Sequence, residues 1–114
     1  MTRRDRAGLA VLSLLFLGWH VPLMYRTEAG QDEDWYGVPG IAILRTGVPQ
    51  IPYLPARQRG SACFYADTIF YALPPLAFYL QALVHAVLGL GIGPARLTAA
   101  LAGLAACYLV LKQA

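Results

Sequence analysis

The residues best suited to catalysis are carboxylates, and three of them are consecutive at positions 32–34. Five of the six Asp and Glu residues lie between positions 28 and 67: Glu28, Asp32, Glu33, Asp34 and Asp67. A carboxylate in such a run can accept a proton from an attacking hydroxyl, or it can help to bind a metal ion. The structural alternative is that these acids stabilise the N-terminus of a following helix through its dipole. An Asp32-x-Asp34 pair offers too few ligands to predict a metal site, so we predict no cofactor.

Two arginines later in the same segment, Arg57 and Arg59, are candidates for anion binding. A guanidinium group binds phosphate in a bidentate manner, and a lipid headgroup at a membrane surface would supply that phosphate. The alternative is that both arginines only keep the segment solvated. Beyond the arginines in the first six residues, no cluster of basic residues is interleaved with aromatics, so the sequence does not favour a nucleic-acid partner.

Long stretches without charged residues predict the helices that must position these side chains. Charged residues make up 13% of the 114 residues, against about 25% in an ordinary soluble domain. Stretches of nineteen, twenty-eight and fifteen residues without charge follow Arg6, Asp67 and Arg96. A membrane span needs about 20 apolar residues, so we predict two transmembrane helices and a third, shorter one. A soluble helical core is the alternative, but residues 7–19 lack the polar stripe that it requires.

The sequence therefore predicts an all-α membrane protein with two to three transmembrane helices. Its expected segments are a basic N-terminus (1–6), a first span (7–25), a loop (26–72), a second span (73–91), a turn (92–96) and a truncated third span (97–112). The first apolar run is longer than the usual 7–15 residues of a secretory signal, which favours an uncleaved anchor. The amino-terminal arginines place the N-terminus and the turn in the cytoplasm, and the loop outside the plasma (inner) membrane.

A short amphipathic helix is expected directly after the acidic run, lying on the outer membrane surface. Residues 38–44 place an apolar side chain at every third position, which suits one helical face. Arg45 and Gly47 are signals for the end of the helix, whereas Pro39 and Gly40 weaken it where they stand.

Taken in order, these features resemble the start of a GT-C-type membrane glycosyltransferase. The branch in question includes protein O-mannosyltransferases and the aminoarabinose transferases of lipid A. The matching motifs are Asp-Glu-x-x-Tyr at Asp32, Glu33 and Tyr36, Gly-x-Pro at 47–49, and Pro-Pro-Leu at 74–76 with Phe78 and Tyr79 after it. The resemblance covers about residues 7–111, and these match only the amino-terminal part of such an enzyme.

The resemblance implies a polyprenyl-phosphate-linked sugar as donor and a lipid or protein hydroxyl as acceptor. It implies Asp32 as the catalytic base, with Glu33 as its supporting neighbour and Tyr36 beside the substrate. Many relatives carry a Lys before the Pro-Pro pair, where this chain has Leu73. Arg57 or Arg59 could substitute for that missing phosphate-binding charge.

Two other functions compete with this interpretation. The chain could be a small, non-enzymatic membrane protein whose loop binds a partner or a lipid. It could also be a membrane-anchored enzyme whose loop is the catalytic domain, but a loop of this length without strand patterns is not expected to build a core. We expect the chain to be a fragment of a larger enzyme, inactive by itself.

Overall fold

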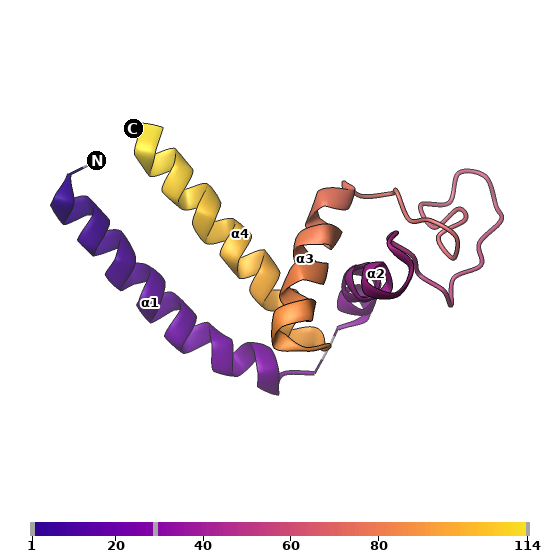
Figure 1. Ribbon diagram of the computed structural model, residues 1–114, viewed down its shortest axis with the longest axis horizontal. Coiled ribbons are helices and arrows are strands. Elements are labelled where there is room, and N and C mark those ends of the chain that lie inside the picture. The colour runs from indigo at the N-terminus through magenta and orange to yellow at the C-terminus, as the bar shows by residue number, and fades with distance from the viewer. Residues whose placement is uncertain (1, 29, 114) are drawn as a thin grey trace.

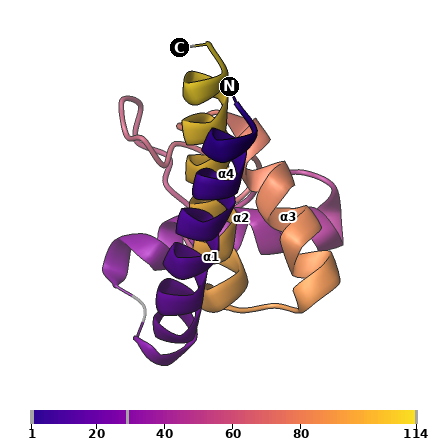
Figure 2. The ribbon, with the colours of Figure 1, turned by 90° about the vertical axis from the view of Figure 1, so that its left-hand side faces the viewer.

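The computed structural model describes residues 2–28 and 30–113, apart from the side chains of Gln31, Asp32 and Asp34. These residues form helices and no strand: α1 (Arg3–Arg26), α2 (Gln31–Thr46), α3 (Pro75–Leu88) and α4 (Ile92–Gln113). Figure 1 shows α1 and α4 side by side, with both chain ends at the same end of the pair. α2 runs across the direction of α1 and α4 (Figure 2). The predicted all-helical class is confirmed.

α1 and α4 are long and apolar enough to cross a membrane. They have 24 and 22 residues, or about 33–36 Å at 1.5 Å per residue. No residue of α1 is buried, and α4 buries only residues 93–95 near its start. Both helices therefore expose apolar side chains on most of their surface, as a membrane span does.

The second predicted span is shorter in the structure than expected. α3 has 14 residues, or about 21 Å of helix, less than the about 20 residues of a typical span. It begins at Pro75, where the Pro-Pro pair favours a start, and it ends before Gly89, which has a φ of +90°. The expected turn at 92–96 is the first turn of α4.

These bounds change the expected membrane topology. α1 and α4 run in opposite directions, so residues 27–91 join neighbouring ends of the two helices (Figure 1). If both helices cross a membrane, everything between them lies on one side of it. A turn at 92–96 on the opposite side from the loop is incompatible with this arrangement.

A small core forms where α2, α3 and the segment between them meet. Its buried residues are Ile51, Cys63, Ala66, Phe70 and Phe78. The N–H of Ile51 donates to the carbonyl of Ala66 at 2.7 Å, and the rings of Phe70 and Phe78 lie 5.7 Å apart. The loop contributes most of this small core, but α3 supplies one wall of it through Phe78.

α2 corresponds to the predicted surface helix, but it buries a different face. It ends before Gly47, which has a φ of +80°, as the sequence predicts. Its buried residues include Gly37, Pro39, Gly40 and Ala42, whereas Leu44 is exposed. A Cβ atom on Gly40 would overlap the side chain of Gln81, so Gly40 allows α2 to pack closely against α3.

Replacing Gly93 by Ala should destabilise the junction of α1 and α4. A Cβ atom at Gly93 would lie 2.6 Å from Cε1 of Tyr25. Overpacking of this kind costs about 1–3 kcal/mol, which opposes the about 1 kcal/mol that Ala gains over Gly inside a helix. Thermal unfolding of the chain in detergent, followed by circular dichroism, measures the effect.

Gly103→Ala in the same helix is the matched control, because nothing lies within 4 Å of a Cβ atom there. This variant should unfold at the wild-type temperature or above it. Equal midpoints for the two variants would contradict the contact between Gly93 and Tyr25.

Candidate functional site

The polar centre of the structure is the guanidinium of Arg96, near the start of α4. Its Nε donates to Oε1 of Glu33 at 2.6 Å, and its Nη2 donates to Oε2 at 2.5 Å. Nη1 also donates to the carbonyls of Met24 (2.9 Å) and Thr27 (3.0 Å), and Nη2 donates to that of Glu28 (2.9 Å). One side chain therefore joins α4 to the end of α1 and the start of α2.

Glu33 is held as a carboxylate at the start of α2. Its Oε2 accepts a hydrogen bond from the N–H of Gly30 at 2.9 Å, so it caps the helix, in agreement with the structural alternative drawn from the sequence. The hydrogen bonds from Arg96 and then from Gly30 lower the pKa of Glu33 to about 2. So weak a base is poorly matched to proton transfer near neutral pH, and Glu33 is suited to positioning.

Asp32 lies in the first turn of α2, beside Glu33, and its side chain is outside the described residues, as is that of Asp34. Tyr36 lies one turn after position 32 and is half exposed. The two ends of the Asp-Glu-x-x-Tyr motif therefore lie one turn apart at the end of α2 that Arg96 holds. Among the described residues, no three His, Cys, Asp or Glu side chains are placed to hold a metal ion.

The structure does not bring Arg57 and Arg59 to this centre. Both lie in the segment between α2 and α3, which is on the side of these helices away from α1 and α4 (Figure 1). Arg57 forms two hydrogen bonds of 2.7 Å with Asp67, and these lower the pKa of the Asp67 carboxyl. Arg59 is exposed and forms no ion pair within the described part of the chain. A phosphate at Arg57 would compete with Asp67.

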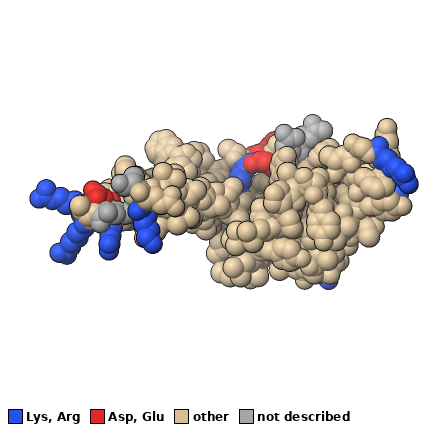
Figure 3. Space-filling model, turned by 90° about the horizontal axis from the view of Figure 1, so that it is seen from above, with Lys and Arg blue, Asp and Glu red and all other residues tan. Residues whose placement is uncertain are grey.

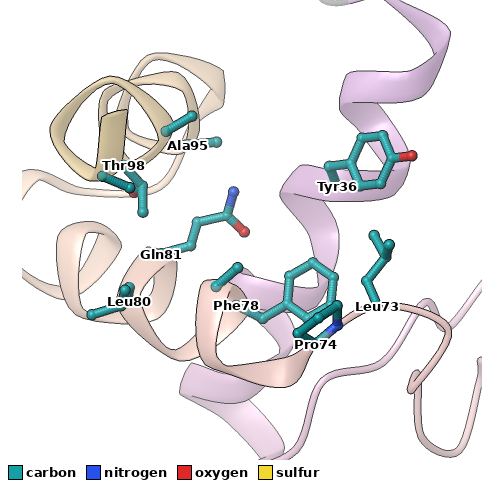
Figure 4. A pocket seen from close by; sticks show the side chains of 11 residues that line it. Tyr36, Leu73, Pro74, Phe78, Leu80, Gln81, Ala95 and Thr98 are labelled. Carbon is teal, nitrogen blue, oxygen red and sulfur yellow. The ribbon is translucent and has the colours of Figure 1, made fainter. Parts of the chain in front are cut away.

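A groove extends from the polar centre between α2, α3 and α4, and we call it the α2–α4 groove. Glu33 and Arg96 line its smaller part, of about 170 Å³. Leu73, Phe78 and Leu80 contribute to its larger part, of about 360 Å³, which Figure 4 shows. Both parts are lined by Tyr36, Gln81, Ala95 and Ala99. A groove with one charged end and an apolar remainder suits an amphiphilic molecule.

Gln81 and Arg96 are the groove residues that sequence reasoning missed. Gln81 is 8% exposed, and its Oε1 accepts no hydrogen bond from the described residues. Figure 4 shows its side chain reaching from α3 into the space between α2 and α4. A signal for Arg96 did exist, because it is the only charged residue between Asp67 and Lys112. A lone cation in an apolar stretch requires a partner, whereas a single Gln carries no such signal.

The chain matches no family model, no curated protein and no solved structure. The resemblance carried by the order of its motifs therefore stays a prediction. Inferences about its function rest on the geometry of the groove and on those motifs.

Glu33→Gln should lower the free energy of unfolding at neutral pH. It should also make that free energy fall less steeply as the pH drops from 4.5 to 2. The folded pKa of about 2 lies below the ordinary value of 4.5. The wild-type chain therefore has the full contribution of Glu33 above pH 4.5 and loses it as the pH falls toward 2. For a hydrogen-bonded but partly exposed pair, we expect a loss of about 1–2 kcal/mol at pH 7.

Unfolding in detergent between pH 2 and pH 8 measures this difference, which should shrink toward pH 2. Glu28→Gln is the matched control, because Arg96 binds only the backbone carbonyl of Glu28. A difference between Glu33→Gln and wild type that is equally large at both ends of the range would contradict the ion-pair explanation.

Proposed function

We propose that residues 1–114 are the amino-terminal part of an integral-membrane glycosyltransferase of GT-C type. The observation that carries this proposal is the α2–α4 groove, whose charged end lies at the acidic start of α2. The order of the Asp-Glu-x-x-Tyr and Pro-Pro-Leu motifs supports the same class. The donor is a polyprenyl-phosphate-linked sugar, and the acceptor is a hydroxyl of a lipid or a protein.

In this proposal Asp32 is the general base. Its carboxylate takes the proton from the acceptor hydroxyl while the hydroxyl oxygen forms a bond to the anomeric carbon. The bond from that carbon to the phosphate oxygen breaks, and polyprenyl phosphate leaves as an anion. Glu33, held ionised by Arg96, positions the first turn of α2, and Tyr36 lines the groove one turn further along.

The leaving phosphate needs a cation, and Leu73 stands where many relatives of this type carry a Lys. Arg57 and Arg59 stay in the proposal as candidate phosphate ligands, but neither lines the groove. Arg59 is the better candidate of the two, because Asp67 already offsets the charge of Arg57.

We also propose that α1 and α4 cross the plasma (inner) membrane with the N-terminus in the cytoplasm. The length and the exposed apolar surface of both helices support the crossing. The arginines of the first six residues support the orientation. In this arrangement α2, α3 and the Glu33–Arg96 pair lie at the outer membrane surface.

A second candidate is a non-enzymatic membrane protein whose loop binds a partner or a lipid. The observation in its favour is that both ion pairs of the described residues are internal: Arg57 with Asp67, and Arg96 with Glu33. Charges paired in this way stabilise a fold and need not serve a substrate.

Asp32→Asn should lower the rate of sugar transfer by at least about 100-fold, because an amide cannot accept the proton of the acceptor. The assay measures transfer of labelled sugar from a polyprenyl-phosphate donor in membranes that contain the complete gene product. Asp34→Asn, two residues away, is the control and should retain activity.

Equal expression of both variants shows that the loss is chemical. Wild-type activity in Asp32→Asn would contradict the role of Asp32 as base. Absence of any transfer in wild-type membranes, across the available sugar donors, would favour the second candidate.

A further inference from the structure

A second cavity lies between α1 and α4, far along both helices from the α2–α4 groove. It measures about 430 Å³, and it shares no lining residue with the groove. Six of its lining residues are Leu9, Ala10 and Ser13 of α1, and Leu104, Ala105 and Tyr108 of α4. Four of these side chains are apolar, and the other two each offer a single hydroxyl. We call this cavity the α1–α4 cleft.

Cationic residues surround the mouth of the α1–α4 cleft. Arg6 lines the cleft itself, and Arg3 precedes it by one turn on the same stripe of α1. On α4, Lys112 follows Tyr108 by one turn on the stripe that begins at Leu104. Because α1 starts where α4 ends, these cations gather at one end of the molecule, as Figure 3 shows.

At this end of the described chain, Lys and Arg side chains outnumber Asp and Glu side chains. Arg3, Arg4, Arg6 and Lys112 form no ion pair within the described part of the chain. The nearby carboxylate of Asp5 accepts a hydrogen bond from the N–H of Thr2 at 2.6 Å, so it caps α1. An anion that also carries an apolar chain would complement both the cleft and its mouth.

We propose that the α1–α4 cleft binds one molecule of an anionic membrane phospholipid. One acyl chain lies between Leu9 and Leu104, and the phosphate lies at Arg6 with Arg3 and Lys112 around it. This proposal rests on the proposed insertion of α1 and α4, and it is independent of sugar transfer.

The position of the cleft favours an anionic lipid as its occupant. Arg6 lines the cleft, which lies at the end that carries the amino-terminal arginines, and the proposed orientation places this end in the cytoplasmic leaflet. Anionic lipids give that leaflet its negative surface potential.

Native mass spectrometry of the delipidated full chain in detergent tests the proposal. Phosphatidylglycerol and phosphatidylcholine with identical acyl chains are the probes. Wild type should bind phosphatidylglycerol more tightly than phosphatidylcholine, by about fivefold for each cation that contacts the phosphatidylglycerol headgroup. Arg6→Gln/Lys112→Gln should reduce this preference by about 25-fold and leave only the contribution of Arg3. Arg26→Gln/Arg45→Gln, which removes the same charge elsewhere, should keep it.

A second variant tests the apolar part of the site without changing charge. Ala105→Trp fills the cleft and should weaken binding of both lipids, whereas Ala106→Trp, next to it but outside the lining, should not. Equal binding of the two lipids by wild type would overturn the proposal. It would also be overturned if the Arg6/Lys112 variant and its control lost the same affinity, or if Ala105→Trp broke a dimer without changing lipid binding.

Discussion

The arrangement of the helices depends on the hydrogen bonds that the guanidinium of Arg96 donates. A cation near the N-terminus of its own helix is unfavourable with respect to that helix dipole. Here the side chain reaches away from α4 to the C-terminus of α1, where the carbonyls of Met24 and Thr27 accept its hydrogen bonds. The carboxylate of Glu33 completes the set from the start of α2. One guanidinium group therefore holds the end of α1 and the start of α2 against α4, although Glu33 and Arg96 are 63 positions apart in sequence.

This geometry commits the carboxylate of Glu33 to the fold. Both carboxylate oxygens of Glu33 are occupied by Arg96, and one also accepts from Gly30. Because Glu33 is occupied in this way, the proposal assigns the catalytic carboxylate to its neighbour Asp32. The same reasoning applies in the loop, where Asp67 holds Arg57. Charged residues that form ion pairs within the fold are therefore weaker candidates for catalysis or substrate binding.

Much of the fold could be predicted from where charges and helix-ending residues stand. The charge-free run after Arg6 predicted α1, and Gly47 predicted the end of α2. The uncharged run between Asp67 and Arg96 led to a predicted span at 73–91, whereas α3 covers 14 residues. A count of uncharged residues cannot tell a membrane span from a partly buried helix with flanking coil.

The candidate site was only half predictable. The acidic start of α2 was visible as a run of carboxylates, whereas Tyr36 was implied only by the family resemblance. Arg96 was assigned to a turn on the opposite side of the membrane from Glu33. The pairing of these two residues could not be predicted, because they are 63 positions apart in sequence and leave no local pattern. Pro39 and Gly40 were interpreted as an interruption, since only the position of α3 shows that there is no room for a side chain at Gly40.

The most direct test of this account is a disulfide bond between α2 and α4. A Cβ atom on Gly37 would lie 3.9 Å from Cβ of Ala95, close to the about 3.8 Å of natural disulfides. Gly37→Cys/Ala95→Cys, in a chain with Cys63→Ala and Cys107→Ala, should form an intramolecular disulfide on mild oxidation in membranes, and peptide mapping would detect it. Gly37→Cys/Gly103→Cys should not form one. Labelling of the two introduced thiols, at positions 37 and 95, from opposite sides of the membrane, without a disulfide, would contradict the arrangement that Arg96 holds together.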